Sequence, residues 1–317
     1  MDSLKNSILQ TIAYFDIFDC PLTANELRHF LDQKISQEKL SEELKNLVNS
    51  RAILLHQGFY TLRLENIIAR QERFSLSRRK LKKALLVSKI FARLPWIKFI
   101  ALANQIGAHN LRDQGDLDFF IIAKPGNLWL TRFVTAGLMA LANQRPTKTK
   151  SRDQICLSFF VTSDNLDLQK YLLTEGDLYF TYWLACLQPL YDSTDYYTQL
   201  ITSNLWLSEK LPNWQKQSNL LELQQEKIKI RTCLNIFNNL EQALKNWQLT
   251  HLASEIKAAE ASGNVIINDQ VLKLHVSDRR KEFMQKYYNK LKELPLVIPG
   301  CDRQSSLPVA RQTGVDQ

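Results

Sequence analysis

The chain has 317 residues, of which 45% are hydrophobic and 23% are charged, and its formal net charge is +9. This composition is typical of folded proteins and excludes a disordered chain, and the length predicts two domains. Its five cysteines are scattered without a CxxC pair, which argues against a disulfide framework or a structural zinc site. No signal sequence is visible and no apolar run reaches the ~20 residues that span a bilayer, so we expect a cytoplasmic protein with no membrane partner.

Residues 1–63 have the pattern of a winged helix-turn-helix domain. Apolar residues at helical spacing predict a first helix over residues 3–15. Thr23 and Ser36 are good N-caps for a second and a third helix. Two short β-like segments then flank Gln57-Gly58, a pair typical of a tight hairpin. Three helices followed by a hairpin are the winged-helix plan.

The charges of this domain and of the segment that follows it do not decide what either of them binds. Residues 37–46, the third helix, contain three glutamates and two lysines, which favours protein contact or internal packing over tight DNA binding. Residues 64–93 predict a long basic helix that connects two domains. Its charge is explained either by a solvated helix face or by a patch that binds a polyanion such as nucleic acid.

A second domain is predicted from residue 94, which makes the whole chain α+β. Residues 94–165 contain three strand-like segments and one helix, and residues 166–298 are predominantly helical, with a late hairpin at Asn268-Asp269. Residues 299–317 are polar and predict a mobile tail. The expected strands cover residues 96–103, 117–123 and 155–162, and the expected helices include 127–143, 222–245 and 248–261.

The most informative motif is Asp116-Leu117-Asp118 at the start of the second strand. Side chains two apart on a strand point to the same face, so the two carboxylates should lie together. Like charges held side by side are costly unless a cation or hydrogen-bond donors compensate, and Mg²⁺ suits carboxylate ligands. A structural alternative is that both aspartates cap the turn at Gly115 and the start of the strand.

Together with the preceding strand, this motif resembles the nucleotidyltransferase superfamily, in which a Gly-Ser or Gly-Gly pair follows one strand and Asp-apolar-Asp opens the next. The resemblance implies that Asp116 and Asp118 are catalytic and bind Mg²⁺, up to two ions, and that a nucleoside triphosphate (NTP) is the substrate. It covers about residues 96–123. The order of winged helix, basic connector, core and helical region is also similar to that of bacterial nucleotidyltransferase-domain proteins.

Two departures from the family pattern stand out. Asn104-Gln105 occupies the position of the small pair, where bulkier side chains fill space that the phosphates need. The third expected strand offers Ser158 where many members have a third carboxylate, and Asp153, just before that strand, is the nearest substitute.

Other candidates for nucleotide contact are Asn104, Gln105, Asn110 and Arg132. Arg132, early in a helix, could pair with a phosphate or with a carboxylate such as Asp118. His109 is more typical of a surface loop than of a phosphate ligand.

Two functions remain open at this point. The first is Mg²⁺-dependent transfer of a nucleoside monophosphate from an NTP to a hydroxyl of an unknown acceptor, which the intact Asp116 and Asp118 pair favours. The second is a catalytically weakened relative that binds or regulates through its winged helix, which Asn104-Gln105 and Ser158 favour.

Overall fold

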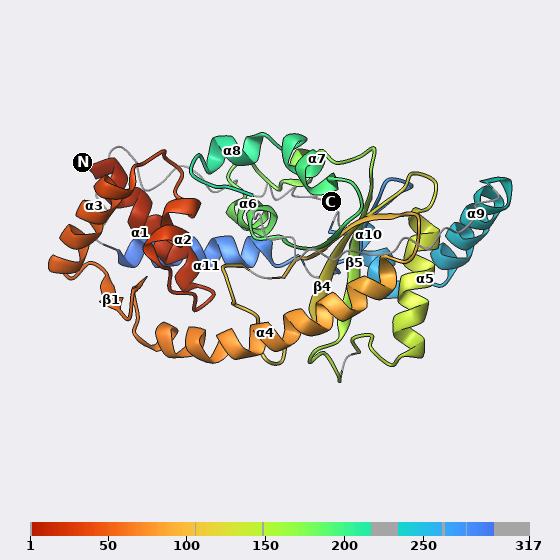
Figure 1. Cartoon of the computed structure of the whole chain (residues 1–317), viewed down its shortest axis with the longest axis horizontal. Helices are drawn as coiled ribbons and strands as arrows, with labels where there is room; N and C mark the ends of the chain where they lie inside the picture. The colour runs from red at the N-terminus through yellow and green to blue at the C-terminus, as the bar shows by residue number, and fades with distance from the viewer. Residues whose placement is uncertain are drawn as a thin grey trace, which may run out of the picture.

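A computed structural model describes residues 2–104, 106–147, 149–216, 234–261, 264–276 and 278–294. It shows a mixed α+β protein, as the sequence predicts, in which helices lie on both faces of a six-stranded sheet. The N-terminal helices lie at one end and the sheet towards the other (Figure 1). The long helix α4 (Glu65–Phe91) runs between the two.

The N-terminal segment forms its elements in the predicted order. The helices are α1 (Asp2–Asp16), α2 (Ala24–Phe30) and α3 (Gln37–Asn49), and the strands are β1 (Leu54–His56) and β2 (Phe59–Thr61). Thr23 and Glu26 form a complete capping box at the start of α2, and Ser36 caps α3. Gln57 and Gly58 both have positive φ, 51° and 81°, as the tight turn between paired antiparallel strands requires.

The predicted connecting helix is observed as α4, but many of its basic side chains are used inside the protein. Arg70 pairs with Glu26, Arg73 with Asp19, and Lys80 with Asp153. The Lys80 side chain is fully buried, whereas Arg78 and Lys82 are exposed. Much of this positive charge therefore anchors α4 to its neighbours instead of facing solvent or a ligand.

The central sheet has the order β6-β3-β4-β5-β8-β7. Only the β4–β5 pair is parallel, and the other neighbouring pairs are antiparallel. The strands are β3 (Ile97–Leu102), β4 (Leu117–Ala123), β5 (Ile155–Thr162), β6 (Gln188–Asp192), β7 (Ile266–Ile267) and β8 (Val271–Lys273). The strands predicted around β3, β4 and β5 and the late hairpin β7–β8 are confirmed.

The C-terminal half contains one strand that the sequence analysis did not predict. Residues 166–298 were expected to be mainly helical with a late hairpin, and within them Gln188–Asp192 forms β6 beside β3. Pro189 lacks the N–H that a continuing helix needs, and an edge strand tolerates that loss. Because β7 and β8 also join this sheet, the sheet is not confined to residues 94–165.

Helices pack around the sheet on both sides. They are α5 (Leu128–Leu141), α6 (Leu178–Ala185), α7 (Tyr196–Thr202), α8 (Trp206–Lys210), α9 (Leu234–Thr250), α10 (Ser254–Ala261) and α11 (Arg280–Glu293), with a short 3₁₀ turn at Gln169–Tyr171. No helix in the described part of the chain is long and apolar enough to cross a membrane. The first part of the predicted helix 222–245 and the predicted tail 299–317 fall outside the described residues.

Alternate residues of β4 belong to two different hydrophobic clusters. Phe120 and Ile122 join a cluster that includes α1, α6 and α7, whereas Phe119 and Ile121 join one that includes α4 and α5. The strand is therefore buried on both faces, which explains its uninterrupted apolar sequence. The first cluster also contains the apolar residues of α1, α2 and α3, so the N-terminal segment shares a core with the sheet.

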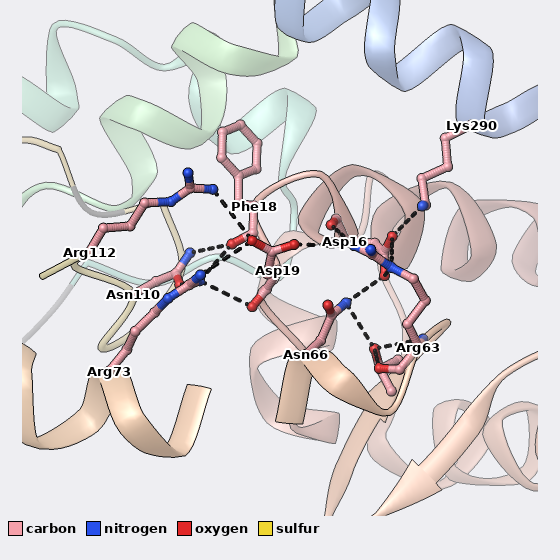
Figure 2. A network of polar contacts seen from close by, with 10 residues as sticks. Asp16, Phe18, Asp19, Arg63, Asn66, Arg73, Asn110, Arg112 and Lys290 are labelled. Atoms are coloured by element: carbon pink, nitrogen blue, oxygen red, sulfur yellow. Dashed lines mark hydrogen bonds and ion pairs between the residues drawn. The ribbon is translucent and has the colours of Figure 1, made fainter. Parts of the chain in front are cut away.

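A polar network ties the N-terminal segment to distant parts of the chain (Figure 2). The buried carboxylate of Asp16, at the end of α1, pairs with Arg63 at 3.1 Å and with Lys290 of α11, and it accepts a hydrogen bond from Asn66 at 2.6 Å. Nearby, Asp19 pairs with Arg73 of α4 at 3.2 Å. These contacts fix α1 against both α4 and α11.

We predict that Asp16→Ala lowers the free energy of unfolding by about 2 kcal/mol, because the buried Asn66 and the partly buried Lys290 lose their acceptor while the half-exposed Arg63 can regain water. Urea denaturation followed by circular dichroism measures the change. Asp164→Ala, at an exposed position, is the control and should stay within about 0.5 kcal/mol of the original protein. Equal stability of the two variants would show that the network does not hold the N-terminal segment.

Candidate metal centre

Asp116 and Asp118 flank the first residue of β4. Leu117 between them is fully buried, and Asp116 and Asp118 are half-buried. The backbone of the motif is held from both sides, since Leu117 donates to the Gln154 carbonyl at 2.7 Å and Asp118 accepts from the Ala103 N–H at 2.8 Å. The start of β4 is therefore fixed between β3 and the segment that leads into β5.

Helix α4 supports the loop that precedes Asp116. The buried ammonium of Lys80 donates to the Gly115 carbonyl and pairs with Asp153 at 2.8 Å. The Asp153 N–H also donates to the Gly115 carbonyl, at 3.1 Å. Asp153, the sequence-based substitute for a third carboxylate, thus anchors this loop through Lys80 and Arg79.

The two aspartates interact electrostatically. Burial, and then the negative charge of Asp118, raise the pKa of Asp116 from 3.8 to about 6. The backbone hydrogen bond of Asp116 and its electrostatic interactions with His275 and Lys80 oppose this rise. The two carboxylates therefore interact unfavourably when both are charged.

An irregularity in β5 places two polar side chains beside Asp118. Asp118 is paired with Cys156, and the next pair is Phe120 with Phe159, so β5 has one extra residue over this interval. The thiol of Cys156 lies 3.3 Å from the Ser158 hydroxyl and also hydrogen-bonds to Asp118. Burial, and then the charges of Asp118 and Asp116, raise the pKa of Cys156 well above its ordinary value, so this thiol is protonated without a cation.

His275 completes the cluster from the other side of β5. The residue before it, Leu274, donates to the Ser158 carbonyl at 2.7 Å, which extends the β5–β8 pairing. The His275 ring nitrogen Nε2 lies 2.8 Å from Ser158 Oγ and 3.9 Å from Asp118 Oδ1. Ligand atoms of Asp118, Cys156 and His275 all lie within 4.8 Å of one another, and no other trio of His, Cys, Asp or Glu in the described ranges is so compact.

A pocket of about 260 Å³ adjoins this cluster. Its lining combines Asp118 and His275 with aromatic and basic side chains. The lining residues are Ala103, Asn104, Asp118, Phe119, Phe159, Tyr179, Phe180, Trp183, Lys273, His275, Asp278, Arg279, Arg280 and Phe283. Tyr179 and Phe283 stack with ring centroids 5.3 Å apart, and Arg279 lies 4.9 Å above the Phe283 ring.

Most of the positive charge in this pocket is paired. Asp278 accepts from Lys273 at 3.0 Å and from Arg280 at 2.6 Å, and Arg280 also pairs with the buried Asp177 at 2.8 Å. Although burial alone would raise it, the pKa of Asp278 falls far below its usual range because Arg280 and Lys273 surround the carboxylate. An anionic ligand would therefore share these cations with Asp278 and Asp177.

The structure brings only part of the predicted nucleotide-binding set to this pocket. Asn104 lines it and donates to the Asp116 carbonyl at 2.8 Å. Gln105 lies outside the described residues. Asn110 is buried instead in the network of Figure 2, where its side-chain oxygen accepts a hydrogen bond from Arg73 at 2.7 Å. It is not among the residues that line the pocket. His109, in the same loop, packs its ring against Phe74 at 4.8 Å.

Arg132 also lies away from the pocket lining. Its guanidinium donates to Gln248 of α9, and burial lowers its pKa to about 10. The start of α5 is occupied as well, because the carboxylate of Glu241 accepts from the N–H groups of Trp129 and Leu130 at 2.8 and 2.7 Å. The N-terminus of α5, which could otherwise attract a phosphate, is therefore capped by the carboxylate of Glu241.

Sequence reasoning identified Asp118 but missed Cys156 and His275. These three residues are separated by 38 and 119 positions along the chain, so no short motif joins them. The absence of a CxxC pair argues only against zinc sites built from paired cysteines. A usable signal was the placement of Cys156 and His275 within or directly after segments predicted as strands.

Comparison of the chain with protein-family models, with curated proteins and with solved structures found no match.

We predict that Asp116 makes the folded protein less stable as pH rises from about 4 to about 6, in metal-free buffer. The unfolded chain releases this proton near the ordinary pKa of 3.8, whereas the folded chain keeps it until about 6. Asp116→Asn, which removes the charge and keeps the shape, should therefore become more stable than the original protein as pH approaches neutrality.

Chemical denaturation at several pH values measures this difference, with Asp164→Asn as the control that should follow the original protein. If Asp116→Asn destabilises the protein at neutral pH, the carboxylate is a structural cap and the repulsion described above is not significant.

Proposed function

We propose that this chain is a nucleotidyltransferase-like protein that uses a divalent cation to transfer a nucleoside monophosphate from an NTP to a hydroxyl of an acceptor. The observation that carries the proposal is the interacting pair Asp116 and Asp118 at the start of β4, of which Asp118 lines a pocket. The antiparallel strand β3 precedes this pair, and Asn104 lies where the resemblance expects the phosphate-binding residues.

The residues present fit one divalent cation better than two. Asp116 and Asp118 offer carboxylate oxygens, and their mutual repulsion would be relieved by a cation. On β5, however, Ser158 stands where a third carboxylate is expected, and Asp153 is engaged by Lys80. A second ion would therefore lack a carboxylate of its own among the described neighbours.

The chain's own residues have distinct tasks in this proposal. Asp116 and Asp118 hold the cation, which when bound would lower the pKa of the attacking hydroxyl and neutralise phosphate charge. Asn104 keeps the Asp116 backbone in place. Arg279, at the pocket edge, is the basic lining residue best placed to meet a phosphate, because its only described carboxylate partner is the exposed Glu282. The aromatic lining offers flat apolar surface for a base.

A specific observation favours the second candidate function, a catalytically weakened binding module. The Asn104 side chain fills space next to the Asp116 backbone that the family reserves for phosphates. The N-terminal helices and hairpin would then act as a winged helix. The outward face of α3 carries Glu38 and Glu42 beside Lys39 and Lys45, a mixture that suits a protein partner better than nucleic acid.

We predict that the protein transfers label from at least one of the four labelled NTPs, supplied with a divalent cation, to a component of cell extract. Asp116→Ala and Asp118→Ala should reduce transfer to background, because each removes a ligand of the cation. Asp164→Ala, an exposed aspartate outside the pocket lining, should leave transfer unchanged. Absence of transfer with all four nucleotides would reject the enzyme and leave the binding module.

A further inference from the structure

The side chains nearest to Asp118 are not those of a typical magnesium site. Its closest potential co-ligands are the Cys156 thiol and the His275 imidazole, with Ser158 between them. Magnesium prefers six oxygen ligands in a regular octahedron and keeps several waters. Thiolate and imidazole ligands instead suit borderline transition-metal ions such as Zn²⁺.

The spacing of these three side chains suits a tetrahedral ion. Zinc bonds to O, N and S ligands are about 2.0–2.3 Å long, so neighbouring ligand atoms in a tetrahedron lie roughly 3.3–3.8 Å apart. His275 Nε2 and Asp118 Oδ1 are separated by 3.9 Å, and all three ligand atoms lie within 4.8 Å. Shifts of a few tenths of an ångström to about one ångström, within the reach of side-chain rotation, would bring them to bonding distance.

Ser158 links two of the three side chains by hydrogen bonds. Its hydroxyl lies 3.3 Å from Cys156 Sγ and 2.8 Å from His275 Nε2, so it bridges the two groups that would bind the ion. Entry of an ion exchanges these hydrogen bonds for coordinate bonds. The Cys156 thiol must then lose its proton, which passes to water as the metal–sulfur bond forms.

Two of the three side chains also line the pocket. Asp118 and His275 are among its lining residues, with side chains 23% and 39% exposed, whereas Cys156 is not. Three protein ligands and one position for water or substrate characterise catalytic rather than structural zinc sites. The pocket therefore provides both an entry path for an ion and space for a ligand of that ion.

We propose that Asp118, Cys156 and His275 form a site for a borderline transition-metal ion of the Zn²⁺ type, with its fourth position facing the pocket. The geometry supports this site independently, but its use in catalysis rests on the proposed function. The ion required at Asp118 would then be zinc-like rather than Mg²⁺, and the proposed nucleotidyl transfer would depend on it.

The test uses full-length, untagged protein freed of metal with a chelator, with Co²⁺ as a coloured substitute for Zn²⁺. We expect Co²⁺ to give a thiolate-to-cobalt absorption band, Zn²⁺ to abolish the band at stoichiometric amounts, and excess Mg²⁺ to leave it unchanged. Cobalt binding without a thiolate band, displacement by Mg²⁺ as readily as by Zn²⁺, or no binding would each overturn the proposal. Because these measurements use the unmutated protein, they do not depend on whether a variant folds.

Variants then locate the site. Cys156→Ser should abolish the band, and His275→Gln should weaken Co²⁺ binding at least tenfold, since even losing residues that only support metal ligands typically costs 10–100-fold. Matched controls are Cys186→Ala, in the hydrophobic cluster that includes α1, α6 and α7, and His251→Gln, exposed and stacked on Trp247. Circular dichroism confirms that each variant is folded. A band that survives in folded Cys156→Ser would place the metal elsewhere.

The metal site and the proposed nucleotidyl transfer can be confirmed or rejected independently. Metal binding as described, without label transfer from any NTP, retains the metal site and rejects the transferase. Label transfer that requires Asp116 and Asp118 and is supported by Mg²⁺, without a thiolate band, retains the transferase and rejects the zinc-like site.

Discussion

The repulsion between Asp116 and Asp118 at the open end of a doubly buried strand is the constraint on which the candidate site depends. The apolar residues of β4 are packed by two separate clusters, so the strand cannot shift to move its acidic end into solvent. Burial, and then the charge of Asp118, raise the pKa of Asp116 and so make its charged form costly. Such a cost is commonly retained where a cation or substrate relieves it.

Different residues contact the two sides of this acidic pair. On one side, Lys80 of α4 holds the loop at Gly115 and engages Asp153. On the other, Cys156, Ser158 and His275 form hydrogen bonds around Asp118. Lys80 therefore fixes the backbone of the loop, while Asp118 lies among the polar side chains that the proposed metal site uses as ligands.

Helix α11 connects the pocket with the N-terminal segment. At its start, Arg280 pairs with Asp177 and Asp278 beside the pocket, and near its end Lys290 pairs with Asp16 of α1. Tyr287, between them, packs against Tyr14 with ring centroids 5.6 Å apart. The long helix α4 forms a second connection through Arg73 and Lys80 (Figure 1). The N-terminal helices are thus continuous with the core that carries the pocket, through both apolar and charged contacts.

The sequence by itself determined the local elements whose signals lie within a few residues. Thr23 and Glu26 specify a helix start, Gln57-Gly58 specifies a hairpin turn, and the apolar segments of β4 and β5 mark buried strands with the observed bounds. Periodicity and capping act locally, so they can be read along the chain. The motif Asp116-Leu117-Asp118 could be singled out for the same reason.

Only the tertiary structure decided which distant residues meet. The sheet order brings β5 and β8 together and thereby places Cys156 and His275 beside Asp118, whereas Asn110 and Arg132, closer to the motif in sequence, point into other contacts. Strand β6 is stabilised by pairing with β3, an interaction that its own helix-like neighbourhood does not reveal. The basic charge of α4 is likewise interpretable only once its partners are known. Strand pairing and ion pairing depend on contacts between residues far apart in the chain, which local patterns do not encode.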